Sequence, residues 1–115
     1  MYKTAIFGAG QAGLMAAARI PAGTELLCYI DNNKEKQGSY INGKPVKSPE
    51  EAIELEPDEM IVAVVNKEVL PGIEEQVRNA GFRGKLTFVN DLRRIRDFRL
   101  AALRLTAQEI RKWKR

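Results

Sequence analysis

The sequence predicts an α/β fold with a mainly parallel sheet of about five strands and a long C-terminal helix. Three observations support this prediction. Short apolar runs alternate with segments of helical spacing, which is typical of parallel strands joined by crossover helices. One run, residues 60–65, is apolar throughout, as expected of a strand buried on both faces of a sheet. A glycine-rich turn, residues 8–13, separates the first apolar run from the first helical segment.

The expected strands are short apolar runs, and the expected helices have apolar residues at helical spacing. The strands are placed at residues 3–7, 25–30, 60–65 and 85–89, with a hairpin over residues 40–46. The helices are placed at residues 11–20, 49–56 and 68–80, with a last one running from residue 91 toward residue 115. Residues 32–39 are polar and predict a loop.

Turn and capping residues set the boundaries of these elements. Pro21-Ala22-Gly23 ends the first helix, and Asn42-Gly43 is the turn signal of the hairpin. Ser48-Pro49-Glu50-Glu51 starts the second helix with an N-cap, a proline at the first position and a glutamate three residues after the serine. Gly81 provides the C-terminal glycine of the third helix, and Asn90 can cap the last helix.

The composition is that of one small domain. The chain has 115 residues, which is enough for a core of its own. No apolar stretch approaches the ~20 residues of a membrane span, and no signal peptide precedes the first strand, so we expect a cytoplasmic protein. The single cysteine, Cys28, excludes an internal disulfide and favours a reducing compartment. Histidine is absent, which argues against zinc, and no metal site is expected.

We expect the chain to divide into a nucleotide-binding body, residues 1–91, and a basic C-terminal helix, residues 92–115, called the tail. The net charge is unevenly distributed between these two parts. Residues 90–115 carry nine Lys/Arg and three Asp/Glu, a net charge of +6, whereas residues 1–89 carry −2. An apolar stripe follows helical spacing in the tail at Leu92, Ile95, Phe98, Ala102 and Leu105. This stripe can cover the sheet or bury against a partner, including a second copy of the chain. A basic helix can also bind nucleic acid or a membrane surface, but we favour a linker helix that leads to a neighbouring domain.

Residues 8–13, Gly-Ala-Gly-Gln-Ala-Gly, match the G-x-G-x-x-G pattern of dinucleotide binding, in the strand–turn–helix context that this pattern requires. The first glycine permits the tight turn, the second lets a pyrophosphate approach the backbone, and the third lets helix and strand pack closely. The helix N-terminus offers free N–H groups and a positive dipole end to phosphate. The predicted ligand contacts are Gly8, Gly10, Gln11, Ala12 and Gly13. The alternative is a turn that keeps the fold but has no ligand.

Asp31 follows Gly13 by 18 residues and ends the second predicted strand. An acid in this position accepts hydrogen bonds from the adenosine ribose and disfavours a 2′-phosphate, so NAD is favoured over NADP. The alternative is a loop aspartate that caps a turn, and Lys34 and Lys36 weaken the preference because either could reach a phosphate. Asn32 and Asn66 are also predicted to contact the ligand, since ligands bind at the carboxyl ends of strands. Asn66 serves equally well as the N-cap of the next helix.

No catalytic group is predicted in the chain. Tyr40 and Lys44 have the spacing of the Tyr/Lys pair of short-chain dehydrogenases, but Asn42, Gly43 and Pro45 argue against the helix that this pair needs. The glycine turn also looks like the FAD-binding opening of flavoprotein monooxygenases, which need a much longer chain. Methyltransferase loops for S-adenosylmethionine usually run G-x-G-x-G instead. We therefore expect binding of NAD, with a nucleotide sugar or CoA as alternatives.

Four segments carry a resemblance to a group of small Rossmann-like domains: AIFGAGQAG, CYIDNNKEKQGSYINGKPV, MIVAVV and GFRGKLTFV. Similar domains occur at the N-terminus of bacterial nucleotide-sugar epimerases/dehydratases of polysaccharide biosynthesis. They also occur in sugar acetyltransferases of the sialic-acid and bacillosamine type, and as the CoA-binding-like domain of Rex-type redox repressors. The resemblance implies a three-layer fold and a nucleotide-type ligand at Gly8, Gly10, Gly13 and Asp31. It leaves the ligand open among NAD(H), CoA and a nucleotide sugar.

Residues 98–113 resemble the helix that leads into a macrocin O-methyltransferase-like domain, which implies that the chain is part of a longer protein. Three functions are then compatible with the sequence. The first is a nucleotide-binding module of a sugar or polysaccharide biosynthesis protein, with chemistry supplied elsewhere. The second is an NAD-dependent nucleotide-sugar oxidoreductase or epimerase completed by oligomerisation. The third is a CoA-binding-like or NADH-sensing regulatory domain.

Overall fold

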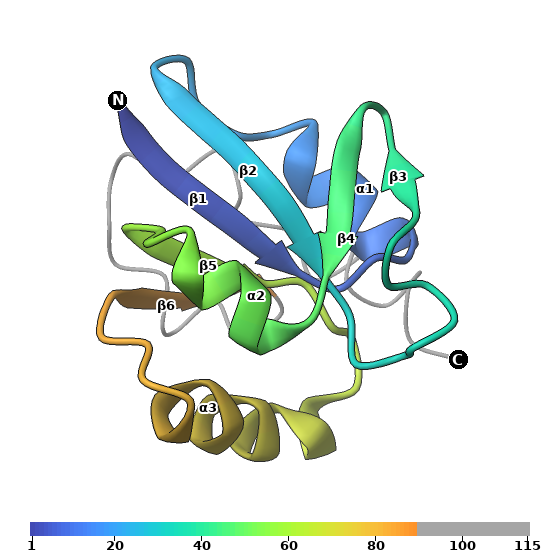
Figure 1. Ribbon diagram of the computed structural model, residues 1–115, viewed down its shortest axis with the longest axis vertical. Helices are drawn as coiled ribbons and strands as arrows, with labels where there is room; N and C mark the ends of the chain where they lie inside the picture. Colours follow the sequence, from blue (N-terminus) through green and yellow to red (C-terminus); the bar gives the residue numbers. More distant parts are fainter. Residues whose placement is uncertain (90–115) are drawn as a thin grey trace.

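Six strands form one twisted sheet in the computed structural model, which describes residues 1–89 (Figure 1). The strands are β1 (Tyr2–Phe7), β2 (Thr24–Ile30), β3 (Tyr40–Ile41), β4 (Lys44–Lys47), β5 (Glu59–Val62) and β6 (Lys85–Phe88). The helices are α1 (Gln11–Ala17), α2 (Pro49–Glu54) and α3 (Leu70–Asn79), with a 3₁₀ turn, η1 (Lys67–Val69), before α3.

The strand order is β3-β4-β2-β1-β5-β6. Neighbouring strands run parallel except for β3, which is antiparallel to β4. The register is fixed at the centre, where Ile6 of β1 lies between Tyr29 of β2 and Ile61 of β5. The prediction of a mainly parallel α/β sheet is confirmed. The predicted hairpin over residues 40–46 supplies both β3 and β4, so the sheet has six strands where about five were expected.

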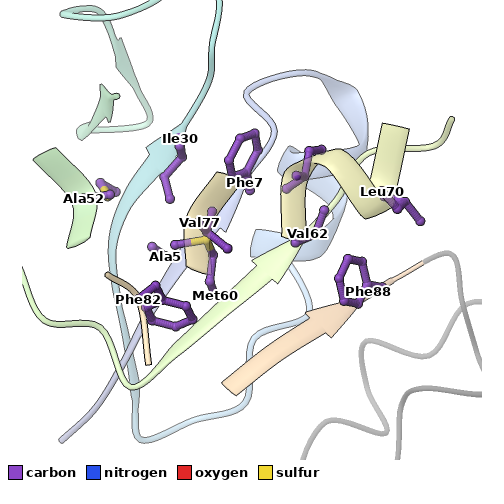
Figure 2. Packing of buried hydrophobic residues seen from close by; sticks show 12 residues of the cluster. Ala5, Phe7, Ile30, Ala52, Met60, Val62, Leu70, Val77, Phe82 and Phe88 are labelled. Carbon is purple, nitrogen blue, oxygen red and sulfur yellow. The ribbon is translucent and has the colours of Figure 1, made fainter. Parts of the chain in front are cut away.

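Helices cover both faces of the sheet, which makes three layers (Figure 1). On one face, α2 and α3 pack against apolar residues that point the same way from four strands. Figure 2 shows this cluster, with Phe7, Ile30, Val62 and Phe88 of the strands facing Val77 of α3. On the other face, α1 contributes Ala16 to a second cluster. The alternation of side chains along each strand produces these two cores.

Three of the predicted caps and turns form as expected. The hydroxyl of Ser48 accepts from the N–H of Glu51 at 3.2 Å, and the carboxylate of Glu51 accepts from the N–H of Ser48 at 3.0 Å. Asn42 and Gly43 have φ values of 49° and 83°, which a tight hairpin turn requires. Gly81 has a φ of 105° directly after α3 and its cap.

Several predicted boundaries are wrong. The helix expected over residues 11–20 ends at Ala17, after which the chain continues in short turns. The strand expected over residues 60–65 ends at Val62. Its neighbour β1 ends at Phe7, and the last hydrogen bond between the two segments runs from the N–H of Ala63 to the carbonyl oxygen of Phe7. The helix expected over residues 68–80 begins at Leu70 after η1, since Pro71 fits only the first turn of a helix.

The predicted last helix, its Asn90 cap and the division of the chain at residues 91 and 92 lie outside the described residues. Within residues 1–89, none of the helices is long and apolar enough to cross a membrane.

Candidate functional site

The glycine turn lies at the carboxyl edge of the sheet, directly after β1 (Figure 1). The chain passes from β1 to β2 on one side of the sheet and later places β5 on the other side of β1. The strand order therefore reverses between β1 and β5. In open parallel sheets, ligands bind outside the carboxyl ends of the strands at such a reversal. The topology thus places residues 8–13 where a ligand crevice is expected.

Gly8 is required by the geometry of the turn. Its φ is +126°, and an added Cβ would lie 2.6 Å from the carbonyl oxygen of Ala63. Its N–H donates to the carbonyl oxygen of Ile30 at 2.7 Å, which ties the turn to the end of β2. A side chain at this position would therefore strain the backbone and collide with the segment after β5.

Gly13 brings α1 close to the turn. An added Cβ would lie 1.9 Å from the carbonyl oxygen of Gly8 and 3.5 Å from Cγ2 of Ile6. The close helix–strand packing expected from the motif is therefore present. The fold by itself accounts for glycine at positions 8 and 13.

Gly10 differs from the other two glycines of the motif. It is exposed, its φ is −103°, and an added Cβ would meet no atom within 4 Å. Packing of the described residues does not require a glycine here, whereas an approaching ligand would. Gln11 is exposed beside it, and Ala12 packs toward the cluster beneath α1. Ligand contacts of Gly10, Gln11 and Ala12 stay predictions.

The shortness of α1 changes what the turn can offer a phosphate. The helix has seven residues, and its N-cap is Gly10, which has no side chain to cap the first N–H groups. So short a helix aligns few peptide dipoles. The N–H groups of Gly8 and Ala9 already donate to Ile30 and Asp31. An anion would therefore be bound by the N–H groups at the start of α1, with little help from a helix dipole.

Asp31 and the glycine turn are held together. One carboxylate oxygen of Asp31 accepts from the N–H of Ala9 at 3.2 Å, across 22 residues of sequence. The other oxygen accepts from the N–H of Asn33 at 2.9 Å, which forms a turn within the loop after β2. The ammonium of Lys36 lies 3.9 Å from the first oxygen, and the Asp31 side chain is 20% exposed. The turn-capping role weighed in the sequence is therefore present, and ribose binding stays a prediction.

Asn32 and Asn66 have partners of their own. The Asn32 amide donates to Oε1 of Gln76 at 3.0 Å, and the Gln76 amide donates to Oδ1 of Asn32 at 2.9 Å. This reciprocal pair joins the loop after β2 to α3. Oδ1 of Asn66 accepts from the N–H of Glu68 at 3.0 Å, so Asn66 caps η1 as its alternative role predicted. Ligand contact by either asparagine stays a prediction.

Two residues around Asp31 were not predicted. The amide of Gln37 donates to the carbonyl oxygen of Asp31 at 2.8 Å and holds the loop after β2 against the end of that strand. Gln76 meets Asn32 from a distance of 44 residues. Neither residue belongs to a motif, so only the folded chain reveals these contacts.

The other reactive side chains do not form a catalytic group with Asp31 in the described residues. Tyr40 is on β3 and Lys44 on β4, so they do not share a helical face, in agreement with a coincidental spacing. Cys28 is buried within β2, and burial raises the pKa of its thiol to about 11, so it stays protonated at neutral pH. Within residues 1–89, three or more potential ligands from His, Cys, Asp and Glu do not gather into a metal site.

The family described as C2185-like, N-terminal, matches residues 1–86. The chain belongs to this family. The match covers every strand of the C2185-like domain except the end of β6. No curated protein sequence matches the chain at a significant level.

Solved structures similar to this C2185-like domain include RSP, a Rex-family repressor, with a TM-score of 0.61 and 22% identity over 77% of this chain. The match spans 53% of the RSP chain, so the domain corresponds to about half of that protein. Other structures of RSP contain β-NAD⁺ with operator DNA, or β-NADH.

Two further similar structures are those of a UDP-sugar dehydrogenase and an acetyltransferase domain. UDP-D-quinovosamine 4-dehydrogenase from Vibrio fischeri has a TM-score of 0.61 and 22% identity, over 79% of this chain and 82% of its own. The acetyltransferase domain of PglB from Neisseria gonorrhoeae FA1090, in complex with acetyl coenzyme A, is 31% identical over 70% of this chain and 40% of its own, with a TM-score of 0.52. These similarities establish a Rossmann-like fold.

Proposed function

We propose that this domain is a nucleotide-binding module whose ligand occupies the carboxyl edge between the glycine turn and Asp31. The observation that carries the proposal is the 3.2 Å hydrogen bond from the N–H of Ala9 to the Asp31 carboxylate. It brings a ribose-type acceptor to the backbone that would receive a pyrophosphate. The open space above Gly10 adds support, because a ligand would account for a glycine that packing does not require.

NAD(H) is the proposed ligand, ahead of a nucleotide sugar or CoA. A 2′-phosphate beside the Asp31 carboxylate would be repelled, which favours NAD over NADP. Lys36 reduces this repulsion in part, since its ammonium lies 3.9 Å from the same carboxylate. The RSP structures with β-NAD⁺ and β-NADH support NAD(H), and the PglB structure with acetyl coenzyme A supports CoA as the competing ligand.

We place the module in a sugar or polysaccharide biosynthesis protein. The similarity to a UDP-D-quinovosamine 4-dehydrogenase supports this placement. In the described residues, the groups around Asp31 at the carboxyl edge are backbone amides, amide side chains, the Lys36 ammonium and the Asp31 carboxylate, which is engaged with the backbone. Such groups bind and orient a nucleotide, and the chemistry would come from another part of a longer protein.

Calorimetry and thermal unfolding of the full chain with NAD⁺, NADH, CoA and UDP-sugars test the proposal. A ligand at 100 times its Kd should add about 2.7 kcal/mol to the free energy of unfolding. Gly10→Val should abolish this gain, because a side chain there would occupy the path of the pyrophosphate. Gly72→Val is the matched control, since Gly72 lies in α3 and also has open space around its Cβ position. A gain that survives in Gly10→Val would place the ligand elsewhere.

A redox-sensing role is the second candidate, and the RSP structures with both NAD⁺ and NADH favour it. A sensor must bind the two forms with different affinities, because a ligand shifts an equilibrium only by its differential binding energy. Operator DNA in one RSP structure makes DNA a partner to include in this test. Equal affinity of the full chain for NAD⁺ and NADH would exclude the switch.

An NAD-dependent nucleotide-sugar oxidoreductase or epimerase, completed by oligomerisation, is the third candidate. The similarity to the UDP-D-quinovosamine dehydrogenase favours it. Reduction of NAD⁺ by the full chain in the presence of UDP-sugars, lost in Gly10→Val, would replace the module by an enzyme.

A further inference from the structure

The loop after β2 is closed by hydrogen bonds on both sides of Lys36. The N–H of Lys36 donates to the carbonyl oxygen of Asn33 at 3.0 Å. The carbonyl oxygen of Lys36 accepts from the N–H and from the hydroxyl of Ser39. The N–H of Gly38 donates to the carbonyl oxygen of Val46 at 2.9 Å, which ties the end of the loop to β4. The loop therefore fixes the place from which the Lys36 side chain extends.

The side chain of Lys36 ends beside the carboxylate of Asp31. Its ammonium lies 3.9 Å from Oδ2, the same oxygen that accepts from the N–H of Ala9. This separation is that of an ion pair and exceeds hydrogen-bond length, so the N–H donors of the ammonium are open to a second acceptor. The Lys36 side chain is 47% exposed. A ligand group that reaches the carboxylate of Asp31 therefore also reaches this ammonium.

The negative charge of Asp31 is itself partly compensated by the backbone. Oδ1 accepts from the N–H of Asn33 at 2.9 Å and Oδ2 from the N–H of Ala9 at 3.2 Å, so each oxygen has one backbone donor. A carboxylate has about four acceptor positions, which leaves room for a ligand hydroxyl. The two N–H groups and the neighbouring ammonium lower the negative potential that a ligand meets here. Asp31 and Lys36 therefore form a site of mixed charge.

The structure distinguishes Lys36 from Lys34, although the sequence offers both lysines as possible phosphate contacts. Both are exposed in the same loop. Among the described residues, Lys36 is the one of the two that pairs with Asp31. Lys36 is therefore the cation placed for an anionic group on a ribose at Asp31, and Lys34 provides a comparison of equal charge.

We propose that Lys36 lets this site accept a phosphate monoester on the adenosine ribose, a group that Asp31 alone would repel. The inference rests on the proposed function, with the ribose of the nucleotide at Asp31. One ribose hydroxyl donates to the carboxylate, and the phosphate on the neighbouring hydroxyl accepts from the ammonium of Lys36. A 2′-phosphate belongs to NADP and a 3′-phosphate to CoA, so both ligands carry the chemistry that Lys36 recognises. Lys36 thereby narrows the preference for NAD without removing it.

Two matched pairs of ligands test this role, with calorimetry on the full chain as the measurement. NADP⁺ differs from NAD⁺ by the 2′-phosphate, and CoA differs from 3′-dephospho-CoA by the 3′-phosphate. Lys36→Ala should weaken the phosphorylated member of at least one pair by about tenfold, which corresponds to one hydrogen bond to a charged group. The affinity for its unphosphorylated partner should be unchanged. Lys36→Arg should restore the lost affinity, and the pair that responds identifies the position of the phosphate.

Lys34→Ala is the matched control, because it removes the same charge from the same loop and should change neither pair. Added salt should reduce the effect of Lys36→Ala, since it screens an exposed ammonium. Equal weakening of both members of each pair, no weakening at all, or a wild type that excludes both NADP⁺ and CoA would overturn the role of Lys36 while the nucleotide site would stand. A wild type that binds none of the four ligands would refute adenosine binding at Asp31, and this inference with it.

Discussion

Two carboxylates, Asp31 and Glu59, show how differently one sheet treats acidic residues at its edge and inside. Asp31 lies at the carboxyl edge, is partly exposed and accepts hydrogen bonds from two backbone N–H groups. Glu59 lies on the α1 face, is fully buried and accepts from the hydroxyl of Thr87. The edge leaves part of its acid exposed to solvent, whereas the interior holds its acid by a hydrogen bond from a buried hydroxyl. We therefore propose that Asp31 serves ligand binding, whereas Glu59 serves the packing of the fold.

The largest expected effect is the loss of stability in Glu59→Ala. A larger loss of stability in Asp31→Ala would contradict the comparison. Glu59→Ala should lower the free energy of unfolding by about 3–5 kcal/mol, because it leaves buried polar groups and a void on a fully covered face. Asp31→Ala should lower it by only about 1–2 kcal/mol, since the freed N–H groups can reach water. Urea unfolding of both variants measures the two effects. Nucleotide affinity should respond in the opposite order, and it should fall mainly in Asp31→Ala.

The glycines of the turn offer the next test. Gly13→Ala should destabilise the fold by about 3 kcal/mol, because its Cβ would lie 1.9 Å from the Gly8 carbonyl oxygen. Gly10→Ala should leave stability within about 0.5 kcal/mol, since its Cβ meets open space. Thermal unfolding in the absence of ligand compares them. Equal destabilisation by both substitutions would mean that the turn needs Gly10 for folding, which would weaken the case for a ligand at that position.

The buried thiol of Cys28 should make the free energy of unfolding depend on pH. Burial raises the pKa of its thiol from 9.0 to about 11. The folded state therefore retains a proton that the unfolded state loses above pH 9, so the free energy of unfolding should fall as pH rises from about 9 to 11. Unfolding of the wild type and Cys28→Ala across this range isolates the contribution. A decline of the same size in Cys28→Ala would assign it to other groups.

The smallest effect concerns the link between the edge and α3. Gln76→Ala breaks both amide hydrogen bonds to Asn32, which are exposed, so stability should change by less than about 1 kcal/mol. The loop after β2 should nevertheless exchange its amide hydrogens faster, because one of its anchors is lost. Gln37→Ala is the comparison, since Gln37 anchors the same loop through the Asp31 carbonyl. Unchanged exchange in Gln76→Ala would show that Gln37 alone holds the loop.

Local patterns predicted most of the fold correctly. The capping box at Ser48, the hairpin turn at Asn42-Gly43 and the glycine after α3 all formed, because each depends on residues close in sequence. The boundaries that failed depend on distant partners. Residues 64 and 65 are as apolar as the rest of their run, yet the strand stops where β1 no longer offers a pairing edge.

The sequence by itself determined the parallel α/β fold and the glycine turn with Asp31 at the end of the neighbouring strand, since these follow from periodicity and from the backbone freedom of glycine. Only the tertiary structure decided that the Asp31 carboxylate accepts a hydrogen bond from the N–H of Ala9 and that Asn32 pairs with Gln76. It also decided that Glu59 lies buried beside Thr87 and Thr4. These contacts join residues far apart in sequence, and their partners are set by strand order and register. A sequence pattern records which groups are present, whereas burial and pairing decide whether an acid is free to bind a ligand or is used to hold the chain together.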